Sequence, residues 1–259
     1  MGITPLSAAW LAKLHQAGLF KNLTSVIDFG GPQSMDYSVN EWSRYAEGYI
    51  QDPEKRDSFI KHVTAVKSGK QSMQVSCLYE TYGLGEYSAI DFMDPMANFK
   101  HDFNFEYRPG QLFDVVTNFG TSEHIFNTGE AFRTIHRLTK PGGLMIHVTP
   151  TYGSYYHGFF KTHSILFESM AHFNNYVIED LSYVYDIFSE NEKFIKQWKI
   201  KLESIKGTPL KNQNLKFFWH YFKSVVAMNE RPMSMIKAVL RKVDEYDFVY
   251  PQQLNKYPG

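Results

Sequence analysis

Short apolar runs that end in turns constrain the fold of this chain more than any other feature. The run Ser25–Phe29 is broken by Gly30, Gly31 and Pro32, as expected for a buried strand that ends in a tight turn. Segments with helical spacing separate this run from others of the same kind, and such alternation predicts a parallel sheet with helices on both faces. The other runs are Tyr87–Phe92, Phe113–Asn118 and Leu144–Val148.

Capping residues and apolar spacing predict the remaining elements. Thr4 and Pro5 begin an N-terminal helix that Gly18 ends, and Asn127 with Glu130 caps a helix that ends before Pro141. Further helices are expected at about 74–82, 189–206 and 232–246, and further strands at about 176–185 and 222–228.

The length predicts one α/β domain, 1–259, because 259 residues with 43% hydrophobic content can bury one large core. A strand-helix-strand unit needs only about 30 residues. Residues 34–72 are therefore expected to be a helical insertion that covers the site as a lid, and residues 186–214 a second helical insertion.

Charge and cysteine content narrow the setting of the protein. Lys+Arg and Asp+Glu balance at 27 each, and no basic stripe accompanies the aromatic residues, which argues against a nucleic-acid partner. No apolar stretch approaches the roughly 18 residues that a membrane helix needs. Cys77 is the only cysteine and no signal sequence is visible, so we expect a cytoplasmic protein, of an oligomeric state that the sequence leaves open.

Acidic residues and glycines mark the predicted carboxyl ends of the strands, where open parallel sheets bind their ligands. Asp28 lies near the end of the first strand, and Gly30 and Gly31 let the backbone approach a ligand closely. Asp91 ends the second strand, where a carboxylate can accept both hydroxyls of a ribose, and Asp102 follows the presumed third.

Taken in order, these motifs resemble those of class I S-adenosylmethionine-dependent methyltransferases, over roughly residues 22–150. The resemblance implies a doubly wound, mostly parallel sheet of seven strands, the last antiparallel. Residues 118–127 are similar to bacterial members of unassigned substrate. The matching motifs are Val26-Ile-Asp-Phe-Gly-Gly31, Ile90-Asp-Phe92, His101-Asp-Phe103, Phe113-Asp-Val-Val-Thr-Asn118 with Glu123-His124, and Arg137-Leu-Thr-Lys-Pro-Gly-Gly143.

The same resemblance implies a role for each marked residue toward the cofactor S-adenosylmethionine, whose product is S-adenosylhomocysteine. Gly30 and Gly31 would face the methionine part, with Asp28 supporting their loop, and Asn118 would hold the ammonium through its carbonyl. The residues implied at the nucleoside are Asp91 at the ribose, Asp102 and the Phe103 backbone at the adenine, and Phe92 in the adenine slot. The glycine loop departs from the family pattern, because it lacks the usual third glycine.

Methyl transfer needs an aligned acceptor and, for a hydroxyl or amine, removal of a proton. Histidine suits this task near neutral pH. We expect His157 to be the catalytic base, with His124 and Glu123 as further catalytic candidates; a packed helix-start residue is the alternative for His124.

Glu123 and His124 also resemble part of the metal site of small-RNA 2′-O-methyltransferases and some quinone O-methyltransferases, which carry Glu-x-x-Glu-His. Gly120 stands where the first Glu would be, so a site from Glu123, His124 and His157 lacks a ligand. The sequence therefore predicts no metal.

An aromatic segment after the last of these runs is expected to bind a small-molecule acceptor, although a small second core under a lid is an equally good interpretation. The residues predicted to form this acceptor wall are Tyr152, Tyr155, Tyr156, Phe159 and Phe160, together with Trp42, Tyr45 and Tyr49.

We expect an enzyme that methylates an O or N atom of a small molecule or natural product. A non-catalytic protein that senses the cofactor or binds a partner is the alternative. An NAD-dependent oxidoreductase fits less well, because the Gly-x-Gly-x-x-Gly spacing is absent.

Overall fold

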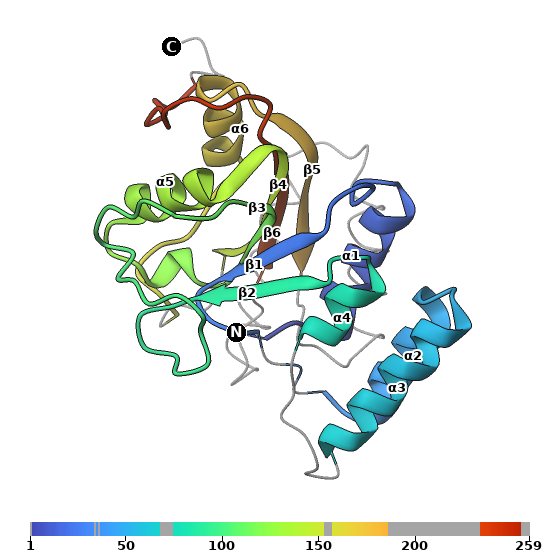
Figure 1. Ribbon diagram of the computed structural model, residues 1–259. Coiled ribbons are helices and arrows are strands. Elements are labelled where there is room, and N and C mark those ends of the chain that lie inside the picture. The colour runs from blue at the N-terminus through green and yellow to red at the C-terminus, as the bar shows by residue number, and fades with distance from the viewer. Residues whose placement is uncertain are drawn as a thin grey trace, which may run out of the picture.

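The computed structural model describes residues 2–33, 35, 37–67, 75–152, 157–185 and 234–254. Their strands form one six-stranded sheet in the order β2-β1-β3-β4-β6-β5 (Figure 1). Strands β1 to β4 run parallel, and β6 runs antiparallel to both of its neighbours, β4 and β5. The strands are β1 Ser25–Phe29, β2 Glu86–Ile90, β3 Phe113–Phe119, β4 Thr139–Tyr152, β5 Val177–Tyr185 and β6 Ser234–Arg241.

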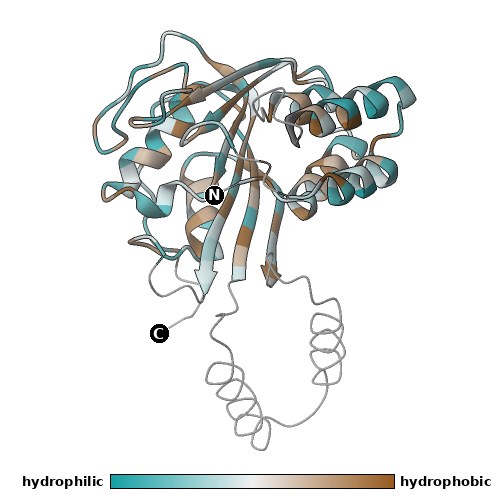
Figure 2. Cartoon of the chain, turned by 90° about the horizontal axis from the view of Figure 1, so that it is seen from below, coloured by the Kyte–Doolittle hydropathy of each residue, from teal (hydrophilic) through white to brown (hydrophobic). Residues whose placement is uncertain are grey.

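Helices cover both faces of this sheet, with α1 to α4 on one side and α5 and α6 on the other (Figures 1 and 2). None of the described helices combines the length and the apolar character that a membrane span requires. The helices are α1 Pro5–Gln16, α2 Val39–Tyr49, α3 Pro53–Lys67, α4 Ser76–Thr81, α5 Thr128–Leu138 and α6 Ser164–Phe173, with a 3₁₀ turn η1 at Ser122–His124.

Alternation along the strands divides the core into two layers. Val26 and Val115 point to the α1–α4 side, whereas their neighbours Ile27 and Val116 point to the α5–α6 side. Because successive side chains of a strand face opposite ways, apolar residues at every position fill both layers at once. The runs that identify the strands in the sequence are apolar for this reason.

The predicted helix starts are largely confirmed by their caps. Thr4 accepts a hydrogen bond from the Ser7 amide with Pro5 in the first turn, and Asn127 accepts one from the Glu130 amide. Helix α5 ends at Leu138 and β4 begins at Thr139, so the turn at Pro141 belongs to an irregular start of the strand. Between β1 and β2 the described residues form the helices α2, α3 and α4.

The strand expected just before Asp102 is reduced to an isolated parallel bridge between Ile90 and Phe99. The Asn98 side chain accepts from the Ala89 amide, where a neighbouring strand would offer a backbone carbonyl. A side chain in this place ends regular pairing. The described part of the sheet therefore lacks the third of the seven expected strands and has six strands.

The helix predicted at 232–246 is wrong, since Ser234–Arg241 forms β6. The apolar residues of this segment fit a helical stripe as well as a strand that is buried on both faces. The segment lies between β4 and β5 in the sheet, and its two faces pack into the two core layers, so it forms a strand. The predicted strand at 222–228 and the helical insertion at 186–214 lie outside the described residues.

Candidate functional site

The glycine turn after β1 is held between the end of β2 and the loop after β3. Gly30 and Gly31 have φ of 103° and 82°, and both of their amides donate to the Ile90 carbonyl, over 2.9 and 3.1 Å. A Cβ built on Gly30 would lie 2.1 Å from Oγ1 of Thr121. The turn therefore needs glycine for its conformation and for this close approach.

Asp28 does not face an open surface, because its side chain is fully buried in β1. It accepts hydrogen bonds from the hydroxyls of Tyr79 (2.7 Å), Tyr87 (2.9 Å) and Thr117, and from the Gln33 amide (3.3 Å). Burial raises the pKa of Asp28, and these hydrogen bonds oppose the rise. Asp28 thus ties β1 to its neighbours and to the end of the glycine turn.

Tyr79 and Tyr87 were not found by sequence reasoning, since their partner lies more than fifty positions earlier in the chain. Tyrosine in a predicted helix or strand ordinarily indicates core packing. Gln33 is a second omission: it is buried, and its Oε1 has no hydrogen-bond partner among the described residues.

At the end of β2, Asp91 has one engaged and one open oxygen. Its Oδ1 accepts from the amides of Met93 (2.6 Å) and Asp94 (2.7 Å), which shapes the loop, whereas Oδ2 has no hydrogen bond to a described residue. Phe92 is 60% exposed beside it, and Met93 and Met96 are exposed as well. An open carboxylate oxygen beside exposed apolar groups is an arrangement suited to a ribose and a flat ring.

Asp102 and Phe103 lie in the loop after the isolated bridge. The Asp102 Oδ1 accepts from the backbone and side-chain nitrogens of Asn104, over 2.9 and 2.8 Å. The Phe103 ring is buried and stacks on Phe29, with 3.8 Å between ring centroids. Phe103 therefore anchors the loop in the core through its ring, which leaves only its backbone for a ligand.

Asn118 organises the loop after β3. Its buried side chain accepts from the amides of Thr121 (3.4 Å) and Ser122 (3.1 Å) and donates to Oγ of Ser122 (2.9 Å). The same Nδ2 lies 3.2 Å from Nδ1 of His147, which packs in the core. The loop that carries Glu123 and His124 is thus fixed to the end of β3.

Glu123, His124 and His157 are brought together by the structure. One ligand atom of each lies within 4.8 Å of those of the other two. Nε2 of His157 is 3.4 Å from Oε1 of Glu123, and the rings of His124 and His157 meet edge to face with 4.7 Å between centroids. The segment after β4 is pinned over η1, because the amides of Phe159 and Phe160 donate to the Glu123 carbonyl.

Burial dominates the electrostatics of this cluster. It raises the pKa of Glu123 to about 7 and lowers the pKa of both His124 and His157. Near neutral pH the two imidazoles are therefore mostly uncharged. Such groups can accept a proton, or they can bind a cation.

The predicted acceptor wall is only partly assembled at this edge. Tyr152 is 48% exposed at the end of β4, whereas Tyr155 and Tyr156 lie outside the described residues. Trp42 and Tyr45 are not at the site, because both are buried in the α1–α4 core layer, where Nε1 of Trp42 donates to the Met35 carbonyl. The aromatic face of α2 therefore packs into the core and does not line the edge of the sheet.

Next to the cluster lie Phe159 and Phe160, which the sequence predicts for the acceptor wall, and Phe126, which the sequence analysis does not single out. Phe126 follows η1 and packs edge to face against Phe159, with 6.2 Å between centroids. Phe126, Phe159 and Phe160 are all exposed. They give this edge an apolar border that a bound molecule can cover.

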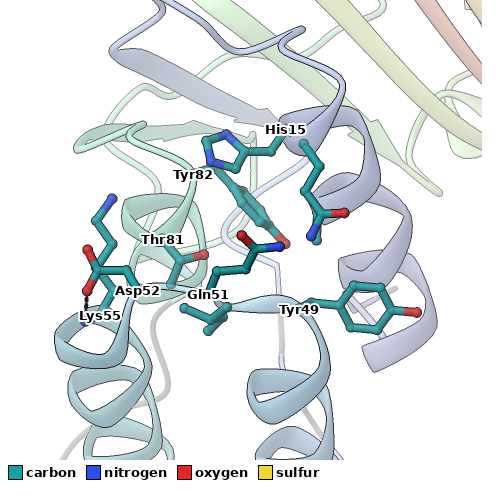
Figure 3. A pocket seen from close by; sticks show the side chains of 10 residues that line it. His15, Tyr49, Gln51, Asp52, Lys55, Thr81 and Tyr82 are labelled. Carbon is teal, nitrogen blue, oxygen red and sulfur yellow. Dashed lines mark hydrogen bonds between the residues drawn. The ribbon is translucent and has the colours of Figure 1, made fainter.

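A pocket of about 450 Å³ lies elsewhere, among the ends of α1, α2 and α4 (Figure 3). His15, Asp52, Lys55 and Tyr82 are among its lining residues. Tyr49 of the predicted acceptor wall also lines it, whereas none of the residues predicted for the cofactor or for catalysis does. Since α1 and α4 lead into the first residues of β1 and β2, this pocket is at the opposite ends of these strands from the glycine turn.

Comparison with known proteins identifies a family. A family model described as a methyltransferase domain matches residues 6–191. No curated protein sequence matches the chain.

Three solved structures resemble the chain at a distance. A protein of Bacillus halodurans described as a methyltransferase is 14% identical, over 90% of this chain and 98% of its own, with a TM-score of 0.47. An S-adenosylmethionine-dependent methyltransferase from Mesorhizobium loti is 11% identical, over 90% and 98%, with a TM-score of 0.42. Phosphoethanolamine N-methyltransferase 2 from Haemonchus contortus, solved with S-adenosyl-L-methionine, is 14% identical with a TM-score of 0.39; the match covers 89% of this chain and only 52% of that enzyme. With TM-scores below 0.5, these structures add nothing to the family assignment.

Proposed function

Since this chain belongs to the methyltransferase-domain family, whose members are enzymes that use S-adenosylmethionine, we propose that it methylates an oxygen or nitrogen atom of a small-molecule acceptor. The observation that carries the proposal is the Glu123, His124 and His157 cluster, bordered by exposed aromatic side chains at the carboxyl ends of the strands. Proton-accepting groups next to an apolar border suit an acceptor with an ionisable group on a flat or apolar body.

The residues around the glycine turn fit S-adenosylmethionine. The open Oδ2 of Asp91 supports a role in accepting ribose hydroxyls, and exposed Phe92 supports a role beside the adenine. We assign Asp102 and the Phe103 backbone to the adenine edge, and Gly30, Gly31 and Asn118 to the methionine part. Asp28 acts through the hydrogen bond that its carboxylate accepts from Gln33 at the end of the turn.

When bound, S-adenosylmethionine supplies a methyl group on a positively charged sulfur. The chain's own residues have to position the acceptor and take its proton. In the metal-free protein, Nε2 of His157 takes this proton, because it has no hydrogen-bond partner among the described residues. Glu123 and His124 flank the base, and exposed Tyr152 and Phe159 contact the body of the acceptor.

The experiment uses the full chain with S-adenosylmethionine labelled in its methyl group and a panel of phenols, catechols, aliphatic alcohols and amines. We expect binding of S-adenosylhomocysteine by calorimetry, and transfer of label to a hydroxyl or amine acceptor. His157→Gln should reduce turnover at least a hundredfold, as removal of a general base does, without changing the affinity for S-adenosylhomocysteine.

His172→Gln is the matched control, since His172 is exposed on α6, away from the cluster. Absence of S-adenosylhomocysteine binding would contradict the proposal as a whole. Transfer of label to carbon or sulfur acceptors alone would contradict the assignment to oxygen or nitrogen.

A further inference from the structure

The carboxylate of Glu123 is the most unusual polar group of the described residues. Its side chain is 0% exposed, and neither Oε1 nor Oε2 has a hydrogen-bond partner among them. Burying a carboxylate without donors is strongly unfavourable, unless the group takes up a proton or meets a cation. The rest of the cluster shows which of these the site is built for.

Two imidazoles lie against this carboxylate, and no described residue donates a hydrogen bond to it. Two nitrogen ligands bound to one ion at about 2.1 Å in tetrahedral geometry lie about 3.4 Å apart. The separation between Oε1 of Glu123 and Nε2 of His157 is already 3.4 Å, and the ligand atom of His124 completes a group within 4.8 Å. Nε2 of His157 is itself buried and has no hydrogen-bond partner in the described part of the chain.

The backbone holds these side chains in place before any ligand binds. The amides of Phe159 and Phe160 donate to the Glu123 carbonyl over 2.7 and 3.2 Å. Gly158, with φ of 70°, comes so close that a Cβ there would lie 2.9 Å from Cγ of Glu123. The close approach sets His157 against η1, as a preorganised binding site requires.

The geometry points to a binding site for one divalent first-row transition-metal ion, formed by Glu123, His124 and His157. One carboxylate and two imidazoles suit Zn²⁺, Fe²⁺, Mn²⁺ or Co²⁺, whereas Mg²⁺ and Ca²⁺ prefer all-oxygen sites. His124 is exposed, so the ion keeps coordination positions open to solvent. The Lys161 ammonium donates to the His157 carbonyl, and neither oxygen of Glu123 accepts a hydrogen bond from a described residue.

The consequence for catalysis rests on the proposed function, whereas the metal site itself does not. With an ion on Nε2, His157 no longer has a lone pair for the proton of the acceptor. The ion, held by Glu123, His124 and His157, would instead supply the positive charge that lowers the pKa of an acceptor hydroxyl, whose proton would pass to solvent as its oxygen takes the methyl group and the carbon–sulfur bond breaks. The products are the methyl ether, neutral S-adenosylhomocysteine and the released proton.

Cobalt provides a direct test, because Co²⁺ bound to nitrogen and oxygen ligands in a low-symmetry protein site has visible absorption bands. The full chain, stripped with a chelator, is titrated with Co²⁺, and the bound Co²⁺ is then displaced with Zn²⁺. We expect saturation at one ion per chain, loss of the bands on displacement, and a higher midpoint of thermal unfolding with metal. Absence of saturable bands together with absence of Zn²⁺ binding by calorimetry would overturn the site.

Glu123→Gln and His157→Gln should each weaken Zn²⁺ binding at least a hundredfold, and His172→Gln should leave it unchanged. Because Glu123→Gln can disturb packing, each variant is also tested for S-adenosylhomocysteine binding and for its unfolding midpoint. A folded His157→Gln variant that binds Zn²⁺ as tightly as the unchanged chain would contradict the inference.

The outcomes separate the metal site from the proposed function. Binding of S-adenosylhomocysteine without metal binding overturns the metal site and leaves methyl transfer standing. Metal binding without S-adenosylhomocysteine binding supports the site and contradicts the proposed function.

Discussion

Asp91 divides its two carboxylate oxygens between the fold and the open edge of the sheet. Oδ1 accepts hydrogen bonds from two amides of its own loop, whereas Oδ2 has no hydrogen bond to a described residue, and the neighbouring Phe92 is exposed. An asparagine keeps one accepting oxygen for the loop but turns the second position into a donor. The change therefore tests the proposed ribose contact without removing the loop.

We predict that Asp91→Asn weakens S-adenosylhomocysteine binding at least tenfold in calorimetry while the unfolding midpoint stays within about 2 °C, since a loss below 0.5 kcal/mol shifts it by about that much. Glu86→Gln is the control, because Glu86 is an exposed carboxylate at the opposite end of β2. Equal affinities for the two variants would remove Asp91 from the cofactor site.

At Gly30 the addition of a single Cβ atom should destabilise the fold. The Gly30 φ of 103° is unfavourable for any residue with a Cβ, and that Cβ would meet the Thr121 side chain at 2.1 Å. Gly30→Ala should lower the free energy of unfolding by roughly 2 kcal/mol or more, measured in urea. Gly85→Ala, where a Cβ meets nothing within 4 Å, should change it by no more than about 0.5 kcal/mol.

Helix α2 shows how far local sequence predicts an element. Ser38 and Glu41 form a reciprocal capping box, and the aromatic spacing of Trp42, Tyr45 and Tyr49 predicts the helix itself. The direction of that aromatic face depends on α1 and α3, which pack against it, and no local pattern contains this information. The sequence therefore predicts Trp42 and Tyr45 at the acceptor wall, whereas the structure buries both in the α1–α4 core layer.

Trp42→Ala should therefore affect stability, whereas Phe159→Ala should affect acceptor binding. Trp42→Ala should lower the free energy of unfolding by about 3–5 kcal/mol, because the fully buried ring leaves a cavity. Phe159→Ala should change the free energy of unfolding little, because Phe159 is 68% exposed, and should instead raise the KM for the acceptor. Urea unfolding and steady-state kinetics on both variants test this, and an effect of Phe159→Ala on stability alone would remove it from the acceptor site.

At the scale of the whole molecule, buried histidines link stability to acidity. Burial lowers the pKa of His147 to about 3, and burial together with Lys242 lowers that of His136 to about 4. Nε2 of His136 is 2.7 Å from the Tyr246 carbonyl and donates to it, and Nδ1 accepts from the Tyr176 hydroxyl, which suits a neutral ring. Below pH 6.5 the unfolded chain therefore binds protons that the folded chain does not.

The contribution of these histidines to the free energy of unfolding should be constant above pH 6.5. Below that pH the free energy of unfolding should fall toward pH 4 by up to about 1.4 kcal/mol per pH unit for each histidine. Urea unfolding at several pH values measures the slope. His136→Gln should have a shallower slope than the unchanged chain, whereas His172→Gln, at an exposed position, should not. Identical slopes for His136→Gln and the unchanged chain would exclude His136 as a cause.

The sequence by itself determined the parts of this protein that rest on short-range patterns. Neighbouring residues set the helix caps at Thr4 and Asn127, the apolar runs of β1 to β4 and the turn at Gly30. The order of these features along the chain resembles that of the family. These features sufficed for the α/β class and the methyltransferase family, and they indicated the edge of the sheet at which we propose the site.

Tertiary structure decided what depends on burial between distant segments. The run that forms β6 fits a helix or a strand until it pairs with β4 and β5 and its two faces pack into the two core layers. The Asn98 side chain accepts from the Ala89 amide, where the family pattern implies a further strand. Glu123 and His157 become one cluster only because the segment after β4 folds back onto η1. Local patterns carry no record of such contacts, since the burial that favours them exists only once the chain has folded.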